Sequence, residues 1–314
     1  MTTVEAPPRG KPDAIKAVPA RHPGRWVATV VVVVLLLMFV HSVLTNDAFQ
    51  WRFMFDNMFT APVLQGARTT IIMTILSMLF GVMIGISIAI MRLSPNRLLS
   101  WTAWIYTWFF RAIPRYVLLF LVGNLAILYH QVDFGVPFDT VIGRAIGING
   151  TARFLSLDSN TIFAGFIAGL IGLSVSEGAY MAEIVRAGIK SVSGGQSEAA
   201  AALGMSRGLT MRRIVLPQAL RVIVPPTGNE AIAMLKDTSL LIAVPVTTEL
   251  FFQLHAIGSR TFQVFPLLVA ACLWYLAMSS VLMIGQYFLE KRFGRGFDEP
   301  SGKARAPAGV ESVA

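Results

Sequence analysis

The chain has 314 residues, of which 55% are hydrophobic and only 14% are charged. A soluble domain carries about 25% charged residues, so this composition and a mean hydropathy of +0.65 exclude an ordinary soluble enzyme and a disordered chain. They favour an integral membrane protein. The net charge of +9 is compatible with nucleic acid or a membrane surface, and the positions of the charges decide between them. The single cysteine, Cys272, excludes an intramolecular disulfide.

Six apolar runs are long enough to cross a bilayer, which takes about 20 apolar residues in a helix. Each run is too long for an ordinary strand. The sequence therefore predicts an all-α membrane protein with six transmembrane helices. The runs span residues 26–44, 69–91, 101–129, 161–184, 222–246 and 266–289.

The first run, at residues 26–44, is predicted to be an uncleaved anchor. Its apolar stretch is longer than the roughly 7–15 residues of a signal peptide, and no small-residue cleavage site follows it. The segments 1–25 and 294–314 are rich in Pro, Gly, Ala and charge. We expect both to be disordered cytoplasmic tails, because they cannot bury enough apolar surface to order themselves.

Basic residues are distributed unevenly between the two sides that these runs define. With the N-terminus inside, 18 of the 26 Lys and Arg residues fall in the inside segments 1–25, 92–100, 185–221 and 290–314. The positive-inside rule then places both termini in the cytoplasm. This distribution explains the net charge without nucleic acid. The outside segment 130–160 is long for a connection, and we expect it to be functional or to hold short helices.

The inside segment 195–217 predicts two short helices joined by a tight turn. Ser197 can cap the first helix. Residues 199–202, which follow Glu198, are all alanine, the best helix former. Gly204 suits a C-terminal cap that needs positive φ. Ser206 can cap the second helix, which Pro217 would end. Composition alone favours an amphipathic helix resting on lipid.

The spacing within this segment favours a different interpretation. The segment contains the pattern EAA-x3-G-x9-I-x-L-P. It begins with Glu198-Ala199-Ala200, continues after three residues with Gly204, and ends after nine more residues with residues 214–217. This resembles the coupling loop of the permease subunits of bacterial ABC importers. The segments 180–186, 216–221, 225–229 and 235–240 are similar to the polar amino-acid (His/Glu/Gln/Arg/opine) permease family in the order expected.

The resemblance covers about residues 60–290 and implies a five-helix permease core, to which the helix at 26–44 is an addition. Two departures stand out. Arg111-Ala112-Ile113-Pro114 replaces the usual Arg-Gly-Thr-Pro, and Ser193-Gly194 replaces the usual Pro-Lys. These departures and the long outside segment leave the identity of the amino acid open.

The resemblance implies a multi-pass protein of the bacterial inner membrane that imports polar amino acids or close derivatives. Its partners would be a pair of ABC ATPase subunits, a periplasmic or lipid-anchored substrate-binding protein, and a second permease in a homodimer or heterodimer. The chain has no G-x-x-x-x-G-K-[ST] loop, so we expect ATP hydrolysis in the partner, no enzymatic activity here and no cofactor bound by this chain. The residues expected to contact the ATPase are Glu198, Ala199, Ala200, Leu203, Gly204 and Met205.

Ionisable residues within apolar runs are candidates for the substrate pathway. Lys236 and Asp237 could alternatively satisfy each other at a helix break near Pro225-Pro226. Arg111 and Arg115 could lie close to the membrane interface or pack against a neighbour. The candidate pathway residues are Arg111, Arg115, Asn229, Glu230, Lys236, Asp237 and Thr238. No histidines fall at metal-ligand spacing, so no metal site is expected.

Two rival functions remain open from the sequence. An ATPase-independent secondary carrier or channel would explain the interrupted helices and the Lys236-Asp237 pair. A membrane scaffold or sensor could use the segment 195–217 to bind some other partner. The carrier or channel does not explain the spacing within that segment.

Overall fold

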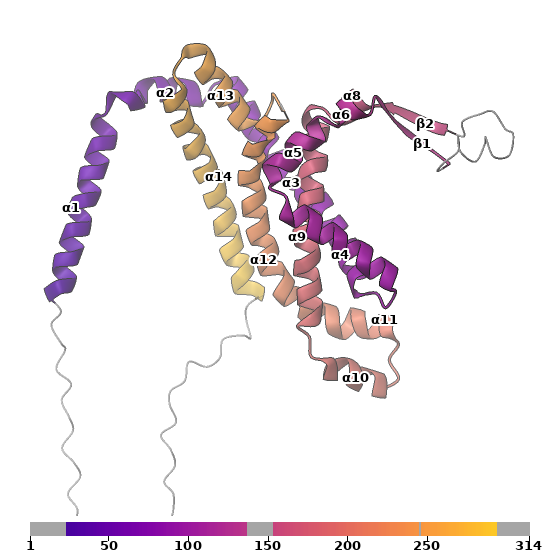
Figure 1. The fold of residues 1–314 in the computed structure, drawn as a ribbon. Coiled ribbons are helices and arrows are strands. Elements are labelled where there is room, and N and C mark those ends of the chain that lie inside the picture. Colours follow the sequence, from indigo (N-terminus) through magenta and orange to yellow (C-terminus); the bar gives the residue numbers. More distant parts are fainter. Residues whose placement is uncertain (1–22, 137–152, 245, 294–314) are drawn as a thin grey trace, which may run out of the picture. The chain divides into compact units, whose positions relative to one another are not determined.

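The structure is a computed structural model that describes residues 23–136, 153–244 and 246–293. The two predicted tails lie almost wholly outside this described part. The chain divides into two units, residues 1–49 and 50–314, which we describe separately (Figure 1).

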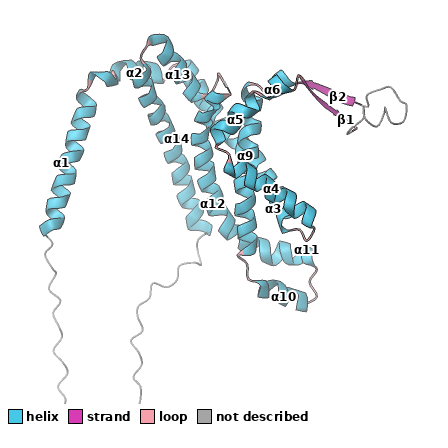
Figure 2. Ribbon diagram, in the orientation of Figure 1, coloured by secondary structure: helices cyan, strands magenta, loops and turns pink. Residues whose placement is uncertain are grey.

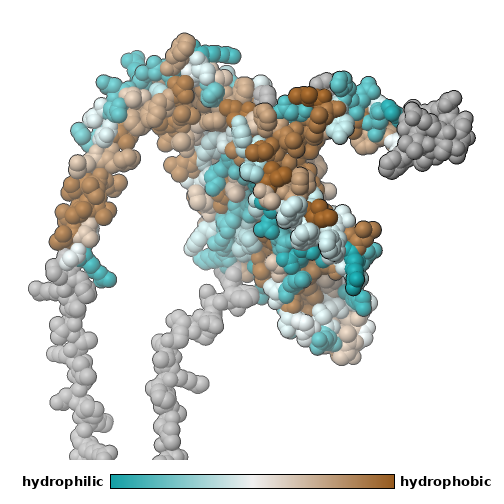
Figure 3. All heavy atoms as spheres, viewed as in Figure 1, coloured by the Kyte–Doolittle hydropathy of each residue, from teal (hydrophilic) through white to brown (hydrophobic). Residues whose placement is uncertain are grey.

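The first unit contains α1 (Pro23–Thr45) and the short 3-10 turn η1 (Asp47–Phe49). Helix α1 matches the predicted run 26–44. It is apolar around its whole circumference, and nearly all its side chains are exposed, as Figure 3 shows on the visible face. A helix that is apolar on every side needs an apolar surrounding, which agrees with a span through lipid.

The second unit is built almost entirely of helices (Figure 2). A two-stranded sheet of β1 (Gln131–Gly135) and β2 (Arg153–Asp158) accompanies them. The helices are α2 (Trp51–Met58), α3 (Ala61–Leu93), α4 (Arg97–Ala112), α5 (Arg115–Gly123), α6 (Leu125–Leu128), α8 (Ser159–Ile162), α9 (Gly165–Lys190), α10 (Gly194–Ala202), α11 (Arg207–Thr210), α12 (Leu216–Asp237), α13 (Leu250–Thr261) and α14 (Val264–Phe293).

Helices α3 and α9 lie side by side at the centre of this unit. A Cβ on Gly85 would lie 2.4 Å from the Cβ of Met181, and one on Gly81 would lie 2.6 Å from the Cγ of Glu177. Small residues let two helix backbones approach closely, which is how helices associate where lipid removes the hydrophobic drive. The two glycines therefore set the α3–α9 distance.

Two clusters of buried apolar side chains hold the other helices around this pair. One cluster joins α3, α5, α9, α12 and the 3-10 turn η3 (Thr238–Ala243). The other joins α2, α3, α13 and α14. The largest buried members are Met73, Leu119, Leu173, Met234 and Leu241 in the first, and Met54, Leu250, Leu254 and Leu267 in the second.

The third predicted run, 101–129, is a broken element. Helix α4 ends at Ala112, and the segment Arg115–Leu128 continues at an angle of 102°. Ile113 is extended because the proline that follows it disfavours the helical conformation. The break falls where Arg111, Pro114 and Arg115 interrupt the predicted run.

Four described helices are long and apolar enough to span a membrane, and the bent pair could supply a fifth. The four are α1, α3, α9 and α14. The predicted run 222–246 overlaps α12, which carries several ionisable residues and is not among them. The count of six therefore stays a prediction.

Helix α12 continues through Pro225 and Pro226, where the sequence placed a helix break. The carbonyl of Pro225 accepts a hydrogen bond from Nε2 of Gln286, at 2.8 Å. The α-helix instead changes to the 3-10 turn η3 after Asp237.

Two segments between the predicted runs contain strands or a helix whose positions the sequence did not specify. Strands β1 and β2 pair antiparallel within 130–160, and Arg153 donates to Asp133 across them at 2.5 Å. The segment between them lies outside the described residues. Helix α13 lies between the predicted runs 222–246 and 266–289. The carboxylate of Glu249 caps it by accepting from the backbone N–H groups of Phe251 and Phe252.

Candidate functional site

The first candidate site is the exposed turn between α10 and α11. Helix α10 begins after Ser193, so Ser197 lies inside the helix and does not cap it, contrary to expectation. The side chains of Glu198, Ala199 and Leu203 are exposed, Leu203 by 82%.

The turn itself has the predicted geometry. Gly204 has φ +75°, its N–H donates to the carbonyl of Ala201 at 2.9 Å, and the N–H of Met205 donates to the carbonyl of Ala200 at 3.0 Å. This pair of bonds is the Schellman motif that ends many helices. Ser206 caps α11 as predicted, accepting from the N–H of Leu209 at 3.4 Å.

The α10–α11 segment is joined to the rest of the unit through buried residues and through the turn that follows α11. Ala200 is buried, and Met205 is half-buried. After α11, the π-helical turn η2 (Met211–Val215) leads directly into α12, so Pro217 lies in the first turn of α12 and does not end a helix. A displacement of α10 and α11 would therefore act on the start of α12.

The second candidate site is a cluster of ionisable side chains around Arg115, the first residue of α5. Its guanidinium lies 2.8 Å from Oε2 of Glu177 on α9 and 2.5 Å from Oδ2 of Asp237 on α12. Glu230 on α12 lies farther away, at 3.9 Å. The bend at Pro114 points this arginine at both helices, so one side chain joins three elements.

Three carboxylates face the Arg115 guanidinium in this cluster, and Arg111 also lies within electrostatic reach of Glu230. Glu177 is fully buried, and its Oε1 has no hydrogen-bond partner among the described residues. Charges placed among apolar helices interact strongly, because the local dielectric constant is low. Carboxylates outnumber the guanidinium groups of Arg111 and Arg115 around this cluster.

Tyr180 connects this cluster to Arg111. The guanidinium carbon of Arg115 lies 4.8 Å from the centroid of the Tyr180 ring, and that of Arg111 lies 5.5 Å from it. Both distances are within the range of cation–π contacts. Hydrophilic residues gather over α12 and the neighbouring parts of α9 and α4 in Figure 3.

The remaining predicted pathway residues are placed differently. Asp237 pairs with Arg115, so Lys236 and Asp237 do not pair with each other. Lys236 and Asn229 are exposed, whereas Thr238 is fully buried and donates to the carbonyl of Leu235 at 2.7 Å.

Glu177, the most buried member of the cluster, was missed by sequence reasoning. A carboxylate in the middle of the predicted helix 161–184 was the signal that could have singled it out.

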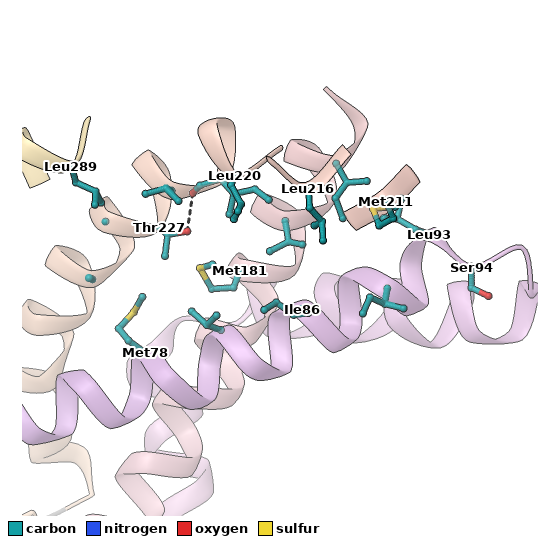
Figure 4. A pocket seen from close by; sticks show the side chains of 18 residues that line it. Met78, Ile86, Leu93, Ser94, Met181, Met211, Leu216, Leu220, Thr227 and Leu289 are labelled. Carbon is teal, nitrogen blue, oxygen red and sulfur yellow. Dashed lines mark hydrogen bonds between the residues drawn. The ribbon is translucent and has the colours of Figure 1, made fainter. Parts of the chain in front are cut away.

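A separate cavity of about 980 Å³ lies between α3, α9, α12 and α14. Met78 and Ile86 of α3, Met181 of α9, and Leu216 and Leu220 of α12 point into it (Figure 4). Its walls are almost wholly apolar. A polar amino acid would gain no hydrogen bonds there, so this cavity is unsuited to hold one.

Residues 81–295 match the family model described as "Binding-protein-dependent transport system inner membrane component". The arginine transport system permease protein ArgU of Corynebacterium glutamicum is 43% identical over 91% of this chain and 85% of its own length. The probable amino-acid ABC transporter permease protein YckA of Bacillus subtilis is 34% identical over 79% of this chain and 97% of its own length. A solved amino acid ABC transporter with histidines superposes with a TM-score of 0.59 at 29% identity, covering 74% of this chain and 95% of that one.

Proposed function

The chain belongs to the family of binding-protein-dependent transport system inner membrane components, and from that premise we propose that it is the permease subunit of an ATP-driven amino-acid importer. The exposed turn at Gly204 carries the proposal. A pair of separate ATPase subunits hydrolyses ATP and moves α10 and α11. Both termini and the α10–α11 turn lie in the cytoplasm, and the chain crosses the inner membrane six times.

The α10–α11 turn suits docking because its two ends differ in burial. Glu198, Ala199 and Leu203 are free to enter a groove of the ATPase, while Ala200 and η2 fix the segment to α12. An ATPase-independent carrier would have no use for such a turn. A second permease, either a copy of this chain or a sister subunit, completes the membrane unit, and a substrate-binding protein delivers the amino acid from outside.

Replacing Gly204 with valine tests the coupling role. Only glycine adopts φ +75° without strain, and a β-branched residue there costs about 1–2 kcal/mol and disfavours the turn. We expect Gly204→Val to lose most ATPase capture and uptake while membrane insertion stays normal. The measurements are binding of the proposed partner ATPase to the full chain in detergent, and uptake in cells.

The matched control is Gly208→Val in the adjacent helix. A side chain at Gly208 also meets nothing within 4 Å, but its φ is not positive. ATPase capture and uptake should both survive this change. Equal capture by both variants would contradict the coupling role.

We infer that the cargo is a cationic amino acid, because three carboxylates face one guanidinium at Arg115. Glu230 is the carboxylate best placed to receive the cargo cation. At 3.9 Å it is too far from Arg115 for a hydrogen bond, and its side chain is a quarter exposed. The relative named as an arginine permease supports this class of cargo.

The preference for a cationic cargo is tested by measuring uptake by the assembled transporter. The panel contains arginine, lysine, glutamine and glutamate. We expect arginine or lysine uptake to fall by about tenfold in Glu230→Gln, as loss of one charge-assisted hydrogen bond implies. The matched control is Glu290→Gln, at the end of α14. Glu198→Gln cannot serve as the control, because Glu198 belongs to the proposed ATPase contact. Transport of glutamate or glutamine in preference to the basic amino acids would overturn the assignment.

A further inference from the structure

A polar pocket of about 430 Å³ lies beside the end of α3, between α4 and α9. Three arginines and one carboxylate line it: Arg92, Arg111, Arg186 and Glu183. Trp104, Trp108 and Tyr180 form its aromatic wall. A smaller neighbouring pocket of about 350 Å³ shares Arg92 and Trp104. The two pockets together follow α4 toward its first turn.

Positive charge is in excess in this pocket. Arg186 donates to Oε2 of Glu183 from Nε at 2.8 Å and from Nη2 at 2.5 Å, and Arg92 lies 4.0 Å from the same carboxylate. Arg92 Nε has no hydrogen-bond partner among the described residues. Arg111 contacts the Tyr180 ring and forms no ion pair within the described part of the chain. Arginine forks of this kind match the oxygens of a phosphate.

The outer surface of α4 next to the pocket is strongly apolar. Trp101, Trp104 and Trp108 follow one another along it, with ring centroids 5.8 Å and 6.2 Å apart. All three are exposed, as are Ile105 and Phe109. Tryptophans gather where acyl chains meet head groups. A small amino acid has no use for such a surface, whereas a lipid has both a phosphate and acyl chains.

We propose that the pocket formed by Arg92, Arg111 and Arg186 binds the phosphate of an anionic phospholipid whose acyl chains lie along the tryptophans of α4. Basic pockets between transmembrane helices on the cytoplasmic side are known to suit such head groups. The assignment to the inner leaflet rests on the proposed function, since it uses the orientation of the α10–α11 turn. The binding itself rests only on charge and shape.

The test is native mass spectrometry of the full chain released from nanodiscs that contain phosphatidylglycerol and phosphatidylcholine together. We expect the chain to retain phosphatidylglycerol at least about tenfold over phosphatidylcholine. The double variant Arg92→Gln/Arg111→Gln should lose this preference. Arg92→Lys/Arg111→Lys keeps the charges and should retain most of it, which separates a lost site from a misfolded chain.

The matched control removes the same charge from two exposed arginines that lie outside α4, in Arg207→Gln/Arg212→Gln. This pair should keep the preference, and an equal loss would mean diffuse attraction to anionic lipid and would overturn the site. Equal retention of both lipids by the unchanged chain, or displacement of phosphatidylglycerol by inorganic phosphate or by arginine, would also overturn it. None of these lipid-binding measurements requires transport. A failed ATPase-capture or uptake assay would therefore contradict the proposed function without changing the result for lipid binding.

Discussion

The carboxylate of Glu249 accepts hydrogen bonds from three helices at once. The Thr70 hydroxyl on α3 and the Tyr275 hydroxyl on α14 reach Oε1 at 2.8 Å and 2.6 Å, and two backbone N–H groups of α13 reach Oε2. Glu249 is fully buried. A buried carboxylate is tolerated where hydrogen bonds satisfy it in this way.

Glu249→Ala should therefore destabilise the chain by about 3 kcal/mol, because it strands several buried donors. Thermal unfolding of the purified chain in detergent measures this. Glu249→Gln keeps one carbonyl oxygen and should cost less. The exposed Glu198→Ala is the control and should leave the unfolding midpoint unchanged; an equal shift in both would show that the network contributes nothing.

At the scale of the element, the interrupted helices were foreseeable and their directions were not. Pro114 marked a break in the sequence, but its 102° bend depends on packing of α5 against α9 and η3. Pro225 and Pro226 looked like a similar break, yet α12 continues through both. Gln286, 61 residues away in the chain, donates to the carbonyl of Pro225, a contact that the sequence cannot reveal.

The close approach of α3 and α9 gives a prediction at this scale. Gly85→Ala places a methyl group 2.4 Å from Met181 Cβ, so the helices have to separate, at a cost of about 1–3 kcal/mol. Gly285→Ala on α14 meets nothing within 4 Å and is the control. The unfolding midpoint should fall by several degrees only in the first variant, and an unchanged midpoint would show that the pair tolerates separation.

At the scale of the whole molecule, Arg115 joins α5, α9 and α12, and α12 continues from the α10–α11 turn. Movement at the proposed ATPase contact would thus reach the cluster around Arg115 through one helix. Two packings of a helix bundle that differ by a few kcal/mol provide a switch of this kind.

Arg115→Gln should destabilise the chain by about 3–5 kcal/mol, because it leaves buried carboxylates without their cation. Arg115→Lys keeps the positive charge, but an ammonium group cannot donate to Glu177 and Asp237 in the fork geometry of a guanidinium. Its unfolding midpoint should therefore lie between those of the wild type and Arg115→Gln. The exposed Arg52→Gln is the control. Equal midpoints for all the variants would contradict a structural role for the cluster.

The sequence by itself determined the membrane character, the family resemblance and the turn at Gly204, because apolar run length and a glycine that needs positive φ are local properties. The spacing of the EAA pattern was sufficient to locate the exposed segment that the structure describes. Only the tertiary structure decided that Asp237 pairs with Arg115 and not with Lys236, that Glu177 joins them and that Thr238 is buried. These facts depend on which faces of α5, α9 and α12 meet, and side chains far apart in the chain become neighbours only once the helices pack.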